Sequence, residues 1–96
     1  MTKGEKAEIK RALEALAAAG WEPTMVDDGE AVNRAVTIEA ALEALEGLDD
    51  ARLLVAPNGK PKGGVLLLVF GNAEDGSEVI ADASDLPEIV AACWPN

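Results

Sequence analysis

Carboxylates are the side chains with which this chain could most readily do chemistry. Its 96 residues include 18 Asp and Glu and one cysteine, but no histidine and no tyrosine. Histidine is the usual general base near neutral pH and the commonest metal ligand. A Ser-His-Asp or Cys-His catalytic site therefore cannot be built within one copy of the chain. The sequence predicts a protein that is not an enzyme.

Two acidic turns, Asp27-Asp28-Gly29-Glu30 and Glu74-Asp75-Gly76, are the candidates for a cation site, because hard cations prefer clustered oxygen ligands. When each glycine is aligned with the sixth position of a calcium loop, Thr24 or Gly71 stands where the first Asp belongs. We interpret both segments as solvated turns and expect no metal and no other cofactor. The best enzymatic alternative is a metal-dependent activity that uses the carboxylates of the first turn.

The possible nucleophiles also have structural interpretations. Cys93 falls on the apolar face of the last predicted helix, which favours a buried small hydrophobic side chain over a reactive thiol. Ser77 and Ser84, the only serines, each stand beside turn or helix-cap signals. None of the three is therefore expected to be catalytic.

The charge distribution indicates the kind of partner. A net charge of −10 disfavours direct binding to nucleic acid or anionic lipid, so a charged partner should be a protein with a basic surface. Four of the eight basic residues lie within the first eleven positions, whereas no Lys or Arg follows Gly63. We take the acidic residues of that last third, together with Trp94, as the candidate partner-binding set: Glu74, Asp75, Glu78, Asp82, Asp85, Glu88 and Trp94.

Cysteine content and hydropathy bear on the cellular compartment. With Cys93 alone, no disulfide can form within the chain, which fits a reducing compartment. The first residues contain no apolar signal region, and the longest apolar run, Val65 to Phe70, is far too short to span a bilayer. We expect a cytoplasmic protein that does not bind membranes.

Three helices are predicted. Thr2-Lys3-Gly4-Glu5 matches a capping box, and apolar residues at helical spacing follow it, so we expect a helix over about residues 3–19. A second helix is capped by Thr37 and ends at Gly47. A short third helix begins after a cap at Asp85.

Asp28-Gly29 predicts a hairpin. The dipeptide suits a two-residue type I′ turn between strands at about residues 21–26 and 30–36. Pro23 cannot donate a hydrogen bond, so we expect the first of these strands at an edge of the sheet.

Three further strands complete the prediction. They cover residues 52–56, 65–70 and about 78–82, and a loop rich in Gly and Pro separates the first two. The strand at 65–70 is apolar on both faces and should lie inside the sheet. The element order is α-β-β-α-β-β-β-α. It indicates one α+β domain over residues 1–96, a five-stranded, mostly antiparallel sheet with two helices on one face and a short C-terminal helix.

Both tryptophan side chains are expected to pack against the hydrophobic core. Trp21 should pack where the first helix meets the sheet. For Trp94 we favour a role in sealing the core over that of an exposed interface anchor, because tryptophan is mostly buried in folded proteins.

The second half of the chain resembles a group of known proteins. The segments Val65–Asn72 and Glu78–Ser84, together with Leu86, look like small uncharacterised proteins carried by phages and prophages. Those proteins also begin with a short helix and contain a segment like Val26–Glu30. The resemblance implies a phage-borne accessory or inhibitory protein, and it carries over no catalytic residues.

Two functions follow as hypotheses. The first is a non-enzymatic acidic protein-interaction module, because the face of the strand at 65–70 that the helices leave uncovered must be buried by something. A homodimer is the simplest arrangement that does so. The alternative is an acidic inhibitor that mimics nucleic acid and binds a host nucleic-acid-binding complex, as anti-CRISPR proteins do.

Overall fold

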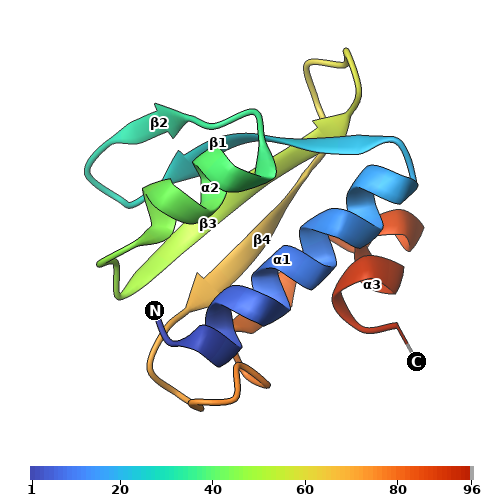
Figure 1. The fold of residues 1–96 in the computed structure, drawn as a ribbon. Helices are drawn as coiled ribbons and strands as arrows, with labels where there is room; N and C mark the ends of the chain where they lie inside the picture. Colours follow the sequence, from blue (N-terminus) through green and yellow to red (C-terminus); the bar gives the residue numbers. More distant parts are fainter. Residues whose placement is uncertain (96) are drawn as a thin grey trace.

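Two layers make up the molecule, an antiparallel sheet and three helices that pack on one of its faces (Figure 1). The computed structural model describes residues 1–95. Its Cα atoms span 33 × 32 × 21 Å, the flattened shape of a two-layer domain. In chain order the elements are α1 (Lys3–Ala18), β1 (Trp21–Asp27), β2 (Val32–Arg34), α2 (Ile38–Leu45), β3 (Asp50–Pro57), β4 (Gly64–Val69), β5 (Ile80–Ala83) and α3 (Pro87–Cys93).

The sheet has the strand order β2-β1-β3-β4-β5, and every neighbouring pair is antiparallel. The predicted α+β class, the five strands and the element order are therefore confirmed. The apolar strand predicted at 65–70 is β4, which lies between β3 and β5 inside the sheet. The last strand starts at Ile80, two residues later than predicted.

The capping box at the start of α1 is formed as the sequence predicts. The backbone N–H of Glu5 donates to Thr2 Oγ1 at 3.1 Å, and the backbone N–H of Thr2 donates to Glu5 Oε1 at 2.7 Å. From this start the helix presents Ile9, Leu13 and Leu16 to the sheet, and all three are buried.

The predicted two-residue turn between β1 and β2 is wrong. Asp27 pairs with Val32, so four residues connect the strands. Asp28 has a negative φ, which a type I′ turn excludes. Its carboxylate instead accepts hydrogen bonds from the backbone N–H groups of Glu30 and Ala31, which favours this longer turn.

The expected edge position of the first strand is also wrong, since β1 lies between β2 and β3. Pro23 is tolerated because β2 pairs with β1 only from Met25 onward, so the missing N–H of Pro23 falls beyond the end of β2. The pairing with β3 is irregular at the same place, between Pro23 and Met25.

Of the two later helix caps, one is as predicted. Thr37 Oγ1 accepts a hydrogen bond from the backbone N–H of Ala40 at the start of α2. In α3, however, the N-cap residue is Leu86 rather than Asp85, and no side chain caps it. Pro87 occupies the first turn, where its fixed φ suits a helix and its missing N–H needs no partner.

The core lies between the helices and the sheet and is mainly aliphatic. Trp21 is 7% exposed and belongs to it, as predicted. The expectation that Trp94 seals the core is wrong, because its side chain is 44% exposed. The buried face of α3 is formed by Ile89, Ala92 and Cys93, and the next residue along the helix turns away from that face.

Among residues 1–95, no helix combines the length and the apolar character that crossing a membrane requires.

Candidate interaction surface

Within the described residues 1–95, one face of the sheet has no helix on it. On β3, for example, Leu53 and Val55 point into the core, so the alternate residues Arg52 and Leu54 point to the other side. We call this side the open face. Its apolar side chains are Met25, Val32, Leu54, Val65, Leu67 and Val69.

The apolar side chains of the open face adjoin one another across the strands. Met25 lies opposite Leu54, which lies opposite Val65, and Leu67 and Val69 follow along β4. Met25 is 39% exposed, whereas Leu54, Val65, Leu67 and Val69 are half-buried and lie outside the core cluster. A single exposed apolar residue is ordinary, but a contiguous apolar patch marks a binding surface.

Charged residues border this apolar patch. Arg34 lies opposite Met25, at one edge of the sheet. Arg52 lies between Asp27 and Leu67, and Asp82 is the neighbour of Leu67 on β5. The open face is therefore an apolar centre with charged residues of both signs around it.

The β3–β4 loop lies over one end of the open face. Pro61 and Lys62 line a groove together with Met25, Leu54 and Val65. Lys60 and Pro61 line a second groove beside Arg34 and Glu22. The loop that the glycines and prolines predicted thus forms one wall of the apolar patch.

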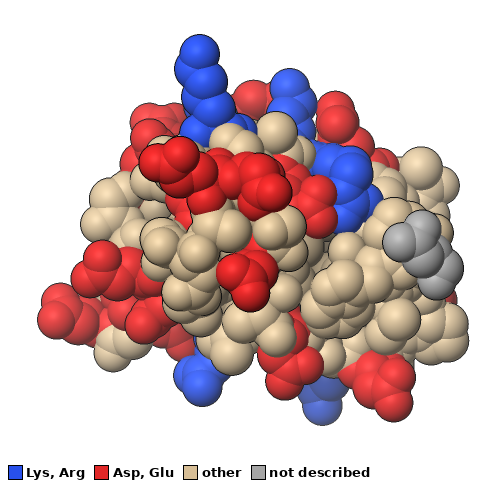
Figure 2. Space-filling model, turned by 90° about the horizontal axis from the view of Figure 1, so that it is seen from below, with Lys and Arg blue, Asp and Glu red and all other residues tan. Residues whose placement is uncertain are grey.

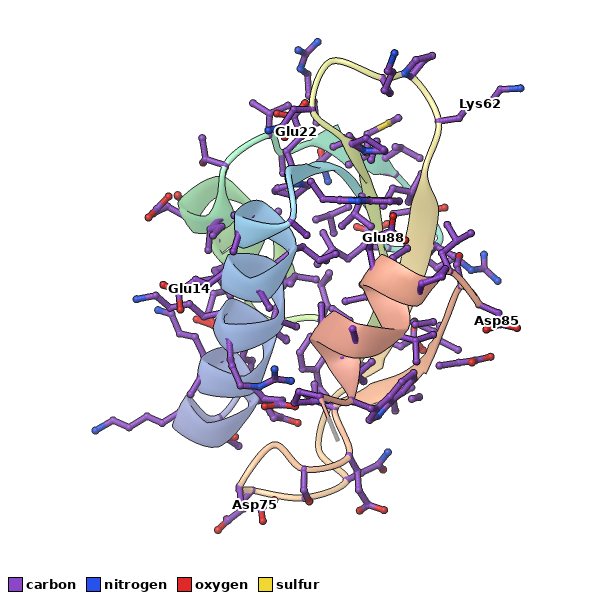
Figure 3. The ribbon with its side chains drawn as sticks, turned by 90° about the vertical axis from the view of Figure 1, so that its right-hand side faces the viewer. Glu14, Glu22, Lys62, Asp75, Asp85 and Glu88 are labelled. Carbon is purple, nitrogen blue, oxygen red and sulfur yellow. The ribbon has the colours of Figure 1, made fainter. Side chains whose placement is uncertain are left out.

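The acidic residues that the sequence marked as partner-binding are all exposed, but they occupy several places. Glu74, Asp75 and Glu78 lie in the β4–β5 loop, and Asp82 lies on the open face. Asp85 and Glu88 lie at the start of α3. Figure 3 shows Asp75 at the end of the molecule away from Lys62, and well separated from Asp85 and Glu88.

Trp94 shares a groove with only one of those acids. The groove follows α3 and is lined by Asp85, Pro87, Val90, Ala91, Trp94 and Pro95. The exposed indole and Asp85 therefore line the same groove, whereas the acidic residues of the β4–β5 loop do not line it.

One Asp side chain in each acidic turn is stabilised in its charged form by backbone N–H groups. The pKa of Asp28 is lowered by the N–H groups of Ala31 and Glu30, and that of Asp75 is lowered by the N–H of Ser77. Figure 2 shows acidic side chains over much of the visible side of the molecule and basic side chains at a few separate places. Both turns are charged at neutral pH.

The last third of the sequence contains no Lys or Arg, but in the structure a basic residue from α1 contacts it. Arg11 of α1 donates from Nη1 to the carbonyl oxygen of Ala92 at 2.9 Å and from Nη2 to that of Cys93 at 3.1 Å. Its Nε also donates to Glu8 Oε1 at 2.8 Å. A guanidinium group therefore stabilises the C-terminus of α3, where positive charge is favourable.

Cys93 is buried against the core, and burial raises the pKa of its thiol to about 11. The thiol is therefore protonated at neutral pH, when it is a weak nucleophile. In the part of the chain that the structure describes, no three His, Cys, Asp or Glu side chains are placed to hold a metal ion.

The charge pattern of the sequence pointed to the acids of the last third and not to the residues of the open face. On β3 the consecutive apolar residues Leu53, Leu54 and Val55 carried the signal, because neighbouring residues of a strand point to opposite faces. On β1 the same rule mispredicts which side chains lie on the open face, because the irregularity between Pro23 and Met25 shifts the alternation of faces.

No family model, curated protein or solved structure matches this chain. The resemblance to phage-borne proteins stays a prediction. Function must therefore be inferred from the surfaces described above.

Proposed function

We propose that this chain is a non-enzymatic protein-interaction module that binds its partner with the open face of the sheet. The observation that carries the proposal is the contiguous apolar patch on the side without helices, centred on Leu54, Val65 and Leu67. The half-buried aliphatic side chains of β3 and β4, with the exposed Met25 beside them on β1, gain stabilisation when a partner removes them from water.

The chemistry of the chain supports a binding role. Enzymes commonly place a titratable group near neutral pH in a cleft, and this chain has no histidine to serve as one. Its single thiol is buried and protonated. The groove between the β3–β4 loop and the apolar patch is lined mainly by aliphatic side chains with Pro61 and Lys62, and it suits contact better than catalysis.

The alternative function, an acidic inhibitor of a nucleic-acid-binding complex, is favoured by a different surface. Glu74, Asp75 and Glu78 are exposed in one loop, and the carboxylate of Asp75 is stabilised by the N–H of Ser77. Such a loop would bind a basic protein surface through long-range attraction that salt weakens.

One capture experiment separates the two. The bait is the purified chain, immobilised and exposed to a lysate of the cells in which it is made, and bound proteins are identified by mass spectrometry. An open-face variant carries Leu54→Ser and Leu67→Ser, and an acidic-loop variant carries Glu74→Gln, Asp75→Asn and Glu78→Gln. Circular dichroism verifies that both variants fold.

We expect the open-face variant to lose the captured partner and the acidic-loop variant to retain it. A partner that is lost only from the acidic-loop variant, and released from the wild type by raised salt, would favour the inhibitor instead. Equal capture by all three proteins would exclude both proposed functions, because neither surface would then be needed for binding.

A further inference from the structure

The basic residues outside α1 are concentrated on the open face and its adjoining loop. Only four Lys or Arg residues follow position 11, namely Arg34, Arg52, Lys60 and Lys62. Arg34 and Arg52 stand on the open face, and the two lysines line the grooves beside it. Within residues 1–95 none of the four forms a salt bridge, since the one ion pair there joins Arg11 and Glu8. These charges are available to a partner.

The open face has a basic end and an acidic end. Lys60 and Lys62 lie in the β3–β4 loop, and Glu22 is the one acid beside them in the groove that Lys60 lines. At the other end of the strands are Asp49 and Asp50, just before and at the start of β3, and the turn that follows Asp27. Arg52, opposite Asp27, is the basic residue beside these acids. Figure 1 shows the β3–β4 loop and the α2–β3 connection at opposite ends of β3.

This pattern is complementary to itself. Two copies of a sheet face each other about a two-fold axis that lies in the plane between them. If the strands of the two sheets are aligned, as in most face-to-face packing, that axis runs either along the strands or across them. An axis along the strands would place basic end on basic end. An axis across the strands places the basic end of each copy on the acidic end of the other, and it keeps the apolar centres in contact.

We propose that the open face binds a second copy of this chain about a two-fold axis across the strands, so that the two sheets pack with their strands antiparallel. Lys60 and Lys62 of each copy then lie beside Asp49 and Asp50 of the other, because the axis keeps β3 over β3. This inference rests on the proposed function and names the partner for it.

The available area is sufficient. An interface of standard size takes about 800 Å² from each partner. That is about one seventh of the 5563 Å² that the chain exposes. The open face is one of the two broad sides of a molecule whose longer Cα extents are 33 and 32 Å.

Charge reversal at the two ends tests the arrangement. One variant carries Lys60→Glu and Lys62→Glu, a second carries Asp49→Lys and Asp50→Lys, and a third carries all four changes and keeps the net charge of −10. The matched control carries Lys3→Glu and Lys10→Glu, two exposed positions on α1, and has the same net charge as the first variant. Sedimentation equilibrium from micromolar to millimolar concentration gives the dimer dissociation constant of each protein.

We expect the first and second variants to raise the dissociation constant about tenfold or more, because each places like charges together twice in the dimer. The four-residue variant, and an equimolar mixture of the first and second variants, should recover an affinity within a few-fold of the wild type. The α1 control should change it much less.

Two outcomes would overturn the inference. A wild-type chain that stays monomeric throughout the concentration range excludes a second copy as the partner, whereas the capture experiment above still tests the open face against other proteins. A dimer that all variants weaken equally, or that the four-residue variant fails to restore, excludes the antiparallel arrangement.

Discussion

Glu5 and Gly71 are joined by a hydrogen bond although 66 positions separate them. The backbone N–H of Gly71 donates to Glu5 Oε2 at 2.7 Å, while Oε1 accepts from the backbone N–H of Thr2 at 2.7 Å. The Glu5 side chain is only 1% exposed. One buried carboxylate therefore holds both the start of α1 and the first part of the β4–β5 loop.

Replacing Glu5 with Gln should destabilise the fold at neutral pH by about 1–3 kcal/mol, because an amide cannot accept both hydrogen bonds without turning its NH₂ toward one of the donors. Urea unfolding of the variant and the wild type measures the difference. The control is Glu14→Gln, an exposed position on the same helix.

The same carboxylate makes stability depend on pH. The N–H of Thr2, followed by that of Gly71, lowers the pKa of Glu5 below its ordinary value of 4.5 in the folded chain, although burial opposes this shift. A group with a lowered folded pKa stabilises the fold above its unfolded pKa and loses that contribution as pH falls through the folded pKa. Below about pH 4.5 the wild type should therefore lose its advantage over Glu5→Gln. A difference in stability that does not change down to about pH 2 would contradict this assignment.

The close approach of α1 to the β4–β5 loop predicts an unusual effect at Gly4. In a solvent-exposed helix, changing Gly to Ala stabilises by about 1 kcal/mol. Here a Cβ on Gly4 would clash with the carbonyl oxygen of Glu74 and would lie 2.7 Å from the Cα of Asp75, both backbone atoms. Gly4→Ala should therefore destabilise, by about 1–3 kcal/mol. A rise in the thermal unfolding temperature would contradict this contact.

The two tryptophans should differ in fluorescence. Trp21 is 7% exposed and Trp94 is 44% exposed. The variant Trp94→Phe, which retains Trp21, should emit at shorter wavelength and resist quenching by iodide. The variant Trp21→Phe should show the opposite behaviour. Equal quenching of the two folded variants would mean that Trp94 is covered in solution.

Cys93 should react slowly in the folded chain. Burial and a thiol pKa of about 11 leave little accessible thiolate near neutral pH. Alkylation by iodoacetamide should therefore be at least about a hundredfold slower than in denaturant, where the pKa returns to about 8.5. Equal rates in the two conditions would contradict a buried thiol.

Much of the fold was predictable because its signals are local. The hydroxyl of Thr2 and the carboxylate of Glu5 lie within one helical turn, so the capping box could be read from four residues. The bond from Gly71 to the same carboxylate could not, because it depends on where β4 ends relative to α1. The predicted cap at Asp85 failed for a local reason, since Pro87 allowed α3 to begin with Leu86 as its N-cap.

The candidate surface was only partly predictable. The sequence indicated that β4 has an uncovered apolar face, because consecutive residues such as Val65 and Leu66, which point to opposite faces, are both apolar. It did not indicate that Arg34, Arg52 and Lys62 lie around that face. Their positions depend on strand order and register, which bring together residues from the β1–β2 and β3–β4 hairpins.

Methyl NMR with a soluble paramagnetic agent tests the central claim most directly, because two side chains of similar exposure lie on different surfaces. Met25 on the open face is 39% exposed and Leu86 beside α3 is 36% exposed in the single chain. We predict that, at a concentration where the dimer forms, the methyl signal of Met25 is protected and those of Leu86 are attenuated. Dilution should make the two alike. Equal attenuation of Met25 and Leu86 at every concentration would show that no second copy covers the open face.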